Sequence, residues 1–249
     1  MIAAVRLIGR MGFTVACIAL LLLLMTLTWC LRLRPLTRRI MQGAFITSAW
    51  VWGIRIRVQG TLATSRPLML VSNHFSYLDL FVLGSKVPVA FTPKTEIRSW
   101  PVLGFMCMVA GCLFIDRRPA KTMGNKRLVE NALESGEIIS LFPEGTTNDG
   151  TAVLPFKSSL FSIALERGMQ VQPVSVLYTQ LNGHDVTPKD YPVIGWYGDS
   201  YFFPHMVQYM KQRGVEAVLK FHPPVSAKDF ASRKELALHC HEAVERGMR

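Results

Sequence analysis

The chain begins with a long apolar segment. Residues 11–31 contain no charged side chain, and a helix over them would measure about 31 Å, close to the thickness of the hydrocarbon core of a bilayer. A secretory signal peptide is the alternative, but its apolar region would be shorter and a small-residue cleavage site would follow. The segment instead runs through Trp29 and Cys30 to Arg32, so the pattern favours a membrane anchor that the protein retains.

A second apolar stretch covers residues 40–54 and has arginines on both sides. A helix of this length would span about 22 Å, which is short for a bilayer crossing. We therefore expect a re-entrant or interfacial helix, with Trp50 and Trp52 at the depth of the lipid headgroups. An ordinary core helix is the alternative.

Beyond about residue 55, apolar runs of strand length alternate with helical patterns. This alternation predicts an α/β fold, a layered sheet flanked by helices, behind an N-terminal membrane-anchoring hydrophobic helical arm. We divide the chain accordingly into residues 1–54 and residues 55–249. The predicted strands cover 67–72, 87–92, 112–116, 137–142, 171–178 and 215–222, and the predicted helices cover 76–85, 99–110, 121–135, 157–167 and 227–247.

Two stretches depart from this regular pattern. Pro173 interrupts the strand predicted at 171–178, and because proline cannot donate a backbone hydrogen bond, we expect an edge or bulged strand there. Residues 179–205 are rich in Gly, Pro, Asp and aromatic residues, which predicts a long functional or capping loop.

The net charge of +11 is concentrated near the N-terminus. The first 66 residues hold nine Arg and no Lys, Asp or Glu, whereas nucleic-acid-binding proteins carry their basic patches on the folded domain. Basic residues beside an apolar segment fit an anionic lipid surface better. We therefore expect membrane lipids, and no nucleic acid, as partners. The arginine excess after the first segment places the globular part on the cytoplasmic side of the inner (cytoplasmic) membrane.

Cysteine and histidine spacing indicates neither disulfides nor a metal site. The five cysteines show no Cys-x-x-Cys pattern, which favours reduced thiols. His239 and His241 are two positions apart in a predicted helix and would point to different faces, so we expect no bound metal.

A first polar motif, residues 73–79, follows directly after a predicted strand, where active-site groups gather in α/β sheets. On a continuous helix, the side chains of His74 and Asp79 would be about 140° apart. They can meet only if His74 lies in a loop and the helix begins near Ser76. Because Ser76-x-x-Asp79 is itself a helix-start pattern, the alternative is that Asp79 only caps a helix and His74 is a loop histidine.

Two further motifs also follow predicted strands. Glu144, Gly145 and Thr146 come after the strand at 137–142, and glycine there permits a tight turn or the close approach of a ligand. Arg117 follows the strand at 112–116, and arginine suits bidentate recognition of a phosphate. A plain Pro-Glu-Gly turn and a solvated strand end are the alternatives.

Taken together, these motifs resemble the glycerolipid acyltransferases, in particular the 1-acylglycerol-3-phosphate acyltransferase family. His74 and Asp79 look like the family's His-x4-Asp motif. Residues 114–117, 142–146 and 171–174 look like its second, third and fourth blocks. The resemblance covers roughly residues 55–225, and the N-terminal arm resembles the family's membrane-docking helices.

The resemblance implies an acyltransferase. An acyl group would move from a thioester, on coenzyme A or acyl carrier protein, to the free hydroxyl of 1-acyl-sn-glycerol-3-phosphate, forming phosphatidic acid in phospholipid biosynthesis. His74 would be the general base, and Asp79 would orient its imidazole and stabilise the imidazolium. The acyl donor would be a co-substrate, and no cofactor is implied. The chain has no Gly-x-Ser-x-Gly sequence, which argues against a serine hydrolase.

The same resemblance assigns the acceptor site. Glu144, Gly145 and Thr146 would position the lysolipid acceptor, and Arg117 would hold its phosphate. Family members that use lysophosphatidic acid often have Arg after Glu-Gly-Thr, where this chain has Thr147. This departure leaves the headgroup of the acceptor open.

A lyso-ornithine lipid is the alternative acceptor. Residues 196–199, Trp-Tyr-Gly-Asp, together with Pro204 and His205, resemble a bacterial subset that includes lyso-ornithine-lipid acyltransferases. Two other classes of protein compete with an enzyme. The presence of His74, Asp79 and Glu144 together argues against a membrane tether that only binds lipid. The near-neutral charge beyond residue 66 argues against a nucleic-acid-binding protein.

Overall fold

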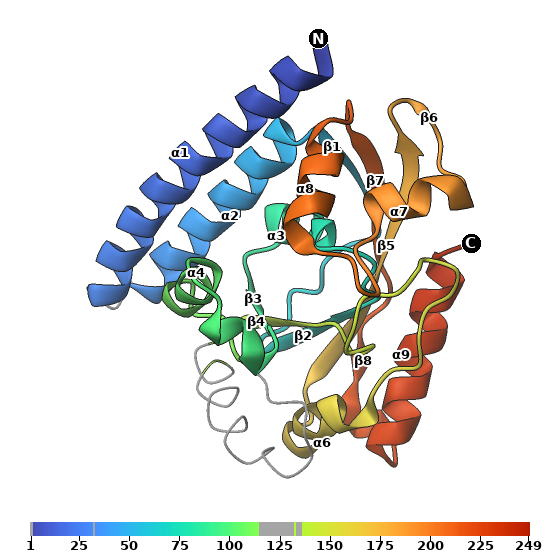
Figure 1. Ribbon diagram of the computed structural model, residues 1–249. Helices are drawn as coiled ribbons and strands as arrows, with labels where there is room; N and C mark the ends of the chain where they lie inside the picture. Colours follow the sequence, from blue (N-terminus) through green and yellow to red (C-terminus); the bar gives the residue numbers. More distant parts are fainter. Residues whose placement is uncertain (1, 32, 115–131, 133–135) are drawn as a thin grey trace.

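A mixed β-sheet lies between two groups of helices in the computed structural model, which describes residues 2–31, 33–114, 132 and 136–249 (Figure 1). The described strands are β1 (Ile54–Gln59), β2 (Leu68–Ser72), β3 (Val89–Phe91), β4 (Ile138–Leu141), β5 (Gln170–Leu181), β6 (His184–Asp185), β7 (Val215–Phe221) and β8 (Val225–Ser226). The described α-helices are α1 (Ile2–Cys30), α2 (Arg34–Val51), α3 (Leu78–Lys86), α4 (Leu103–Val109), α6 (Ser162–Arg167), α7 (Tyr191–Ile194), α8 (Phe202–Met210) and α9 (Arg233–Gly247).

The topology of the sheet brings two of the predicted motifs to one edge. The strand order is β1-β7-β5-β2-β4-β3, with β6 and β8 paired to β5. β2 is parallel to both β4 and β5, whereas β5 is antiparallel to β7. Because β2 and β4 are parallel neighbours, their C-terminal ends meet at the same edge of the sheet. Residues 73–79 and 142–146 follow these two ends.

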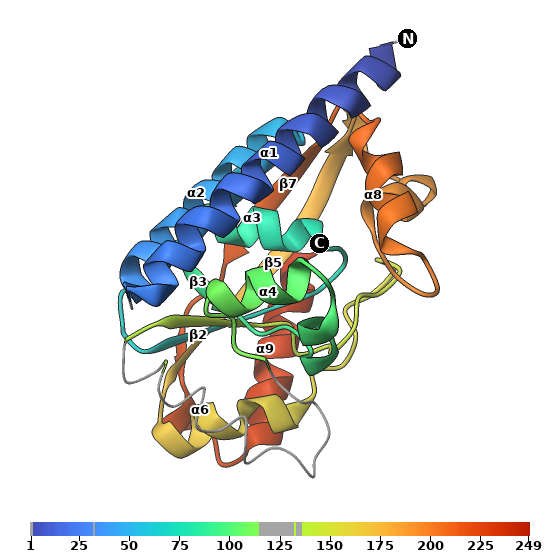
Figure 2. The ribbon, with the colours of Figure 1, turned by 60° about the vertical axis from the view of Figure 1, so that its left-hand side comes forward.

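Alternating side chains of the strands bury a hydrophobic core on each face of the sheet. On β2, Leu68 and Leu70 pack with α2, α3 and α8, whereas Met69 and Val71 pack with α6 and α9. Figures 1 and 2 show the same division, with α2 and α3 on one side of the sheet and α6 and α9 on the other. The predicted α/β class, a sheet flanked by helices, is confirmed.

Several predicted elements differ from the structure. Residues 112–114 form no strand, and the rest of that predicted strand, like most of the helix predicted at 121–135, lies outside the described residues. The helix predicted at 227–247 begins late, at Arg233, where Ser232 Oγ caps it by accepting a hydrogen bond from Glu235 N. β1 was not predicted, although its Ile-Arg-Ile-Arg-Val-Gln alternation is typical of a half-buried strand.

Pro173 lies in a central strand and not at an edge. β5 is bulged against β7, as the alternative had it, but the register shift falls between Tyr178 and Gln180 and not at Pro173. β5 pairs with β8 through Gln170 and Val171, and with β7 from Val174 onward. On this side of β5, Pro173 falls between the two ladders, so its missing N–H removes no hydrogen bond from either of them; on the other side it is paired with Val71 of β2. Its carbonyl still accepts a hydrogen bond from His222 N at 3.0 Å.

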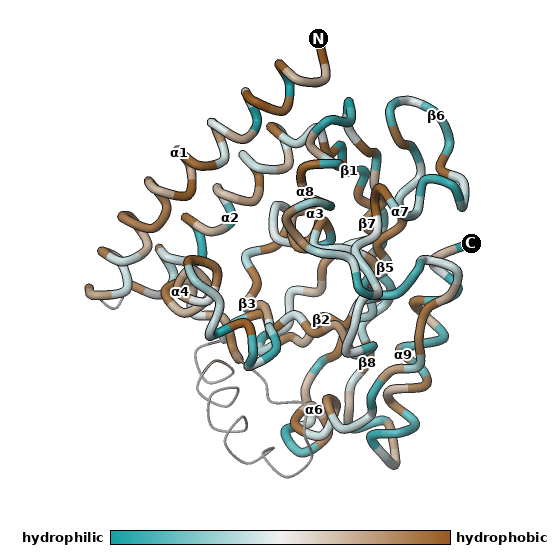
Figure 3. Tube along the Cα trace, in the orientation of Figure 1, coloured by the Kyte–Doolittle hydropathy of each residue, from teal (hydrophilic) through white to brown (hydrophobic). Residues whose placement is uncertain are grey.

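The N-terminal arm presents a long apolar surface. α1 is long and apolar enough to cross a membrane by length and composition, and Figure 3 shows hydrophobic positions along most of it. Leu20, Leu23 and Leu27 are each more than half exposed. Such a surface is unfavourable in water and fits contact with lipid.

The second apolar stretch lies in α2 up to Val51 and continues to the first residue of β1. It has features of both the core helix and the interfacial helix. One side packs in the core, where the Phe45 ring makes edge contacts with Phe81 and Phe91. Trp52 is buried against Tyr77, Phe81 and Tyr209 rather than at headgroup depth. On the opposite side, Trp50 is 78% exposed. Since Trp52 and Ile54 belong to the same core, the packing continues across residue 54.

Both ends of α1 contact the rest of the protein. Near the N-terminus, the guanidinium of Arg10 donates hydrogen bonds to the backbone carbonyls of Met210, Gln212 and Arg213, at the end of α8. Near the other end, Met25 is fully buried against α4. α1 therefore lies along the protein and does not lead away from it.

The close contact between α2 and α3 can be tested by a stability measurement. A Cβ atom on Gly84 of α3 would collide with the ring of Phe45. Overpacking of this kind costs about 1–3 kcal/mol, although alanine is favoured over glycine in a helix by about 1 kcal/mol. We expect Gly84→Ala to lower the free energy of unfolding by about 1–2 kcal/mol, measured by urea titration of the detergent-solubilised protein.

Gly43→Ala in α2 is the matched control, because, its own helical turn aside, no atom of the described residues lies within 4 Å of the Cβ that it adds. It should be neutral or stabilising by up to about 1 kcal/mol. Equal losses of stability in the two variants would contradict the α2–α3 contact.

Candidate active site

His74 and Asp79 meet at the C-terminal end of β2. His74 lies in the loop after this strand, and Asp79 lies in the first turn of α3, which begins at Leu78. His74 Nδ1 and Asp79 Oδ2 are 2.8 Å apart. With five positions between them, the two side chains can meet only if His74 is in a loop and the helix starts near Ser76, and the structure meets both conditions.

The contact with Asp79 defines the tautomer of His74. An ionised carboxylate can only accept hydrogen bonds, so Nδ1 must be the donor. In the neutral imidazole the lone pair is then on Nε2, as a general base requires. One face of the ring stacks on Phe142, with centroids 4.1 Å apart, and the side chain is 19% exposed. The arrangement can therefore take a proton from a bound hydroxyl.

Asp79 is fully buried, and both its oxygens accept hydrogen bonds. Oδ2 also accepts from the backbone N–H groups of Phe75 and Ser76, at 2.8 and 2.9 Å. The helix-cap interpretation thus describes a real contact, but it coexists with the contact to His74. Oδ1 accepts from the hydroxyl of Tyr178 at 2.6 Å. Burial, followed by the charge of Asp79, raises the pKa of Tyr178 well above its usual value, so this hydroxyl keeps its proton.

Tyr178 is not among the site residues predicted from the sequence. β5 pairs with β2 only over residues 170–174 and then continues past the end of β2, which carries Tyr178 to Asp79. The signal in the sequence was a single tyrosine within a predicted strand. Its partner lies 99 positions away, and the pairing depends on the strand order.

Glu144 binds the backbone of the loop that carries His74. Its side chain is almost fully buried. Oε1 accepts a hydrogen bond from His74 N at 2.6 Å, and Oε2 accepts from Asn148 Nδ2 and Leu154 N. Burial raises the pKa of Glu144, and the hydrogen bonds, led by that from His74 N, oppose the shift. Glu144 therefore positions the proposed base, and its predicted role toward the acceptor stays a prediction.

The neighbouring turn places a cation beside the site. Gly145 has a φ of +79°, and a Cβ there would collide with the ammonium end of Lys157. Thr146 is exposed and can face a ligand. Lys157 was not singled out from the sequence, because it is twelve positions from Gly145 and reaches the turn only through the fold.

The segment predicted as a long loop at 179–205 contains β6, α7 and the start of α8. Its middle part packs on the loop after β2. Trp196 N donates to Phe75 O at 3.2 Å, and the Phe75 and Tyr197 rings stack with centroids 6.4 Å apart. A Cβ on Gly195 would collide with the Phe75 ring. This segment is therefore part of the wall beside His74.

Arg117 lies outside the described residues, so its predicted phosphate contact stays a prediction. Among the residues that the structure describes, no three His, Cys, Asp or Glu side chains are grouped to share a metal ion.

Known acyltransferases match this chain in sequence. Residues 54–177 match the Acyltransferase family model. The chain is 37% identical to a lyso-ornithine lipid O-acyltransferase of Rhodobacter capsulatus, over 80% of this chain and 71% of that protein. It is 36% identical to a 1-acyl-sn-glycerol-3-phosphate acyltransferase of Neisseria gonorrhoeae, over 51% of each.

A solved structure shares the fold. The 1-acyl-sn-glycerophosphate (LPA) acyltransferase PlsC of Thermotoga maritima aligns with a TM-score of 0.63 and 22% identity, over 96% of this chain and 95% of that one. Fold, family match and relatives define the class as an acyltransferase. The chain belongs to the glycerolipid acyltransferase family, and the prediction from its motifs is confirmed.

Tyr178→Phe tests the buried hydrogen bond to Asp79. The ring is kept, but a hydrogen bond to a charged group, worth about 1.5–3 kcal/mol, is removed. We expect kcat to fall about 10-fold or more with little change in KM, because His74 loses its orientation while no substrate contact changes. A thioester-cleavage assay with saturating acceptor measures both constants.

Tyr209→Phe is the matched control. Its hydroxyl donates to Trp52 O at 3.3 Å within the same core. This variant should have the kcat of the wild type. An equal fall in kcat in both variants would mean that Tyr178 contributes only to packing.

Proposed function

We propose that this acyltransferase moves an acyl group from a thioester to the free hydroxyl of a lyso-ornithine lipid in the membrane. The chemistry rests on the His74–Asp79 pair, with Nδ1 bound and Nε2 basic. Acyl transfer to 1-acyl-sn-glycerol-3-phosphate, which the motif resemblance favoured, is the second candidate.

The relatives favour the lyso-ornithine acceptor. Four proteins described as lyso-ornithine lipid O-acyltransferases match 74–84% of this chain at 31–37% identity. The neisserial 1-acyl-sn-glycerol-3-phosphate acyltransferases match 51% of it at 36% identity. Thr147 supports the same choice, because an ornithine headgroup carries a carboxylate and an amine but no phosphate, and needs no second phosphate-binding arginine.

The reaction needs one base and no covalent enzyme intermediate. His74 Nε2 takes the proton of the acceptor hydroxyl as the oxygen attacks the thioester carbonyl. Asp79 stabilises the resulting imidazolium through Nδ1. Collapse of the tetrahedral intermediate forms the ester and breaks the C–S bond, and the imidazolium returns its proton to the thiolate of coenzyme A or acyl carrier protein.

The N-terminal arm brings the acceptor to this base. The exposed leucines of α1 contact lipid, and both ends of α1 are bound to the domain. The base and the lipid-contacting surface therefore belong to one folded unit. We place the domain on the cytoplasmic face of the inner membrane, where a soluble thioester donor can reach a lysolipid in the adjoining leaflet.

His74→Ala tests the chemistry. Loss of a general base lowers turnover by about 10²- to 10⁴-fold, and we expect this loss with wild-type thermal unfolding. Asp79→Asn should also lose activity, because its amide cannot stabilise the imidazolium as a carboxylate does. Wild-type turnover in folded His74→Ala protein would contradict the mechanism in which His74 is the general base.

The acceptor is tested by comparing kcat/KM for lyso-ornithine lipid and lysophosphatidic acid. We expect the wild type to prefer lyso-ornithine lipid, and Thr147→Arg to improve the use of lysophosphatidic acid. Arg117→Ala should then affect both acceptors equally. If Arg117→Ala instead lowers kcat/KM only for lysophosphatidic acid, on the order of 10-fold or more for a charge-assisted contact, the result would favour 1-acyl-sn-glycerol-3-phosphate as the acceptor.

A further inference from the structure

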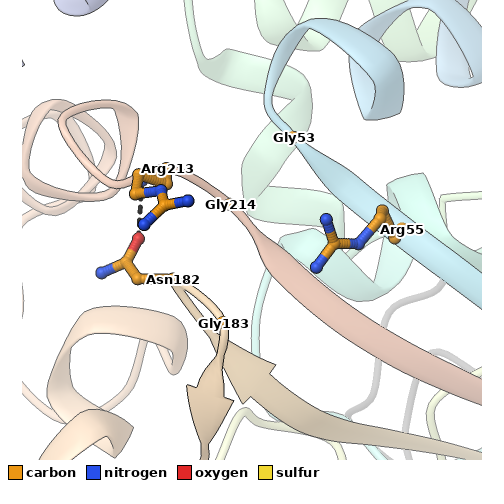
Figure 4. A pocket seen from close by; sticks show the side chains of 6 residues that line it. All are labelled: Gly53, Arg55, Asn182, Gly183, Arg213 and Gly214. Carbon is orange, nitrogen blue, oxygen red and sulfur yellow. Dashed lines mark hydrogen bonds between the residues drawn. The ribbon is translucent and has the colours of Figure 1, made fainter.

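A cavity of about 310 Å³ lies outside the set of residues around His74. It is lined by Gly53, Arg55, Asn182, Gly183, Arg213 and Gly214 (Figure 4). Three chain segments meet here: the link from α2 to β1, the turn between β5 and β6, and the link from α8 to β7. The reaction proposed above uses none of these residues.

Hydrogen bonds between the three segments build the frame of the cavity. Asn182 Oδ1 accepts from Arg213 N at 2.6 Å, and Asn182 N donates to Gly214 O at 2.8 Å. Gly53 O accepts from Val215 N at 3.1 Å. Because half of the lining residues are glycines, a ligand can approach the backbone closely.

The lining is cationic, with two arginines and no acidic residue among its six members. The carboxylate of Glu216 is 3.7 Å from Arg55 but is held more tightly by Arg57. Arg10 adds a third guanidinium behind Gly53, where it is bound to backbone carbonyls and not to a carboxylate. The positive charge at the cavity is thus only partly compensated.

The cavity adjoins the lipid-contacting helices. α1 reaches it through Arg10, and the apolar side chains of Ile2, Val5 and Ile8 on the same end of α1 are exposed. Trp50, at the end of α2 and three positions before Gly53, is also exposed. Tryptophan beside basic residues is typical of the headgroup layer of a membrane, and this composition fits a cavity that faces lipid phosphates.

We propose that this cavity binds the phosphate of an anionic glycerophospholipid, with the Arg55 and Arg213 guanidinium groups as its ligands. Arginine holds phosphate through two parallel hydrogen bonds. The bound lipid would orient the protein on the membrane surface and would not be a substrate. The inference rests on the membrane attachment included in the proposed function. A binding assay tests it without acyl transfer, so failure of either idea can be recognised separately.

The experiment measures co-flotation of the full-length protein with vesicles of phosphatidylcholine, with and without phosphatidylglycerol. We expect the wild type to prefer the anionic vesicles. The double variant R55A/R213A should bind them about 30-fold more weakly, since each basic side chain near an anionic surface contributes about fivefold. The charge-matched control R233A/K234A alters α9, on the other face of the sheet from α2, and should keep wild-type binding.

R55K/R213K separates a phosphate site from diffuse attraction. Lysine keeps the charge but lacks the planar fork, so a built site predicts only partial recovery. Full recovery, or an equal loss in R233A/K234A, would overturn the proposal.

Two further measurements identify the source of the anion that the cavity binds. Free glycerol phosphate, at the concentration of the lipid, should not displace the protein from anionic vesicles. Displacement would show a site for a soluble phosphate and overturn the proposal. Unchanged vesicle binding by R55A/R213A, with a raised KM for acyl carrier protein thioester, would assign the cavity to an acidic protein partner instead.

Discussion

The buried carboxylate of Asp79 is the interaction on which the site depends. A charge without solvent is tolerated only when hydrogen-bond donors surround it. The donors here are the backbone of the loop after β2, the imidazole of His74 and the hydroxyl of Tyr178. Satisfying this charge therefore fixes the loop, the first turn of α3 and the tautomer of the histidine together. Catalytic orientation and local folding have the same physical cause.

Glu144 repeats this arrangement from the neighbouring strand. It is also buried, and it receives the backbone N–H of His74. One carboxylate thus holds the ring of the proposed base and the other holds its main chain. Because β2 and β4 are parallel neighbours, both carboxylates can reach one residue. The site is consequently a property of three adjacent strands, with β5 supplying Tyr178.

The arginines of the N-terminal arm are not all directed at lipid. Arg10 binds the end of α8, and Arg38 binds the carbonyls of Ala110 and Gly111 as well as the carboxylate of Glu137. Such contacts fasten α1, through Arg10, and α2, through Arg38, to the domain. The arm can then carry lipid contact and still hold a constant position relative to His74.

The sequence by itself determined the elements whose cause is local. The uncharged run predicted α1, and the alternation of apolar runs predicted the α/β class. The five-residue spacing of His74 and Asp79 set the condition for their contact, a loop histidine followed by a helix start. Only the tertiary structure decided which distant groups complete the site. Tyr178, Lys157 and the segment around Trp196 reach it through strand order and chain crossings, and Pro173 is tolerated in a central strand because two ladders meet there. The periodicity of a segment indicates which of its own side chains are buried. The residues that these side chains contact across the sheet depend on the topology of the whole chain.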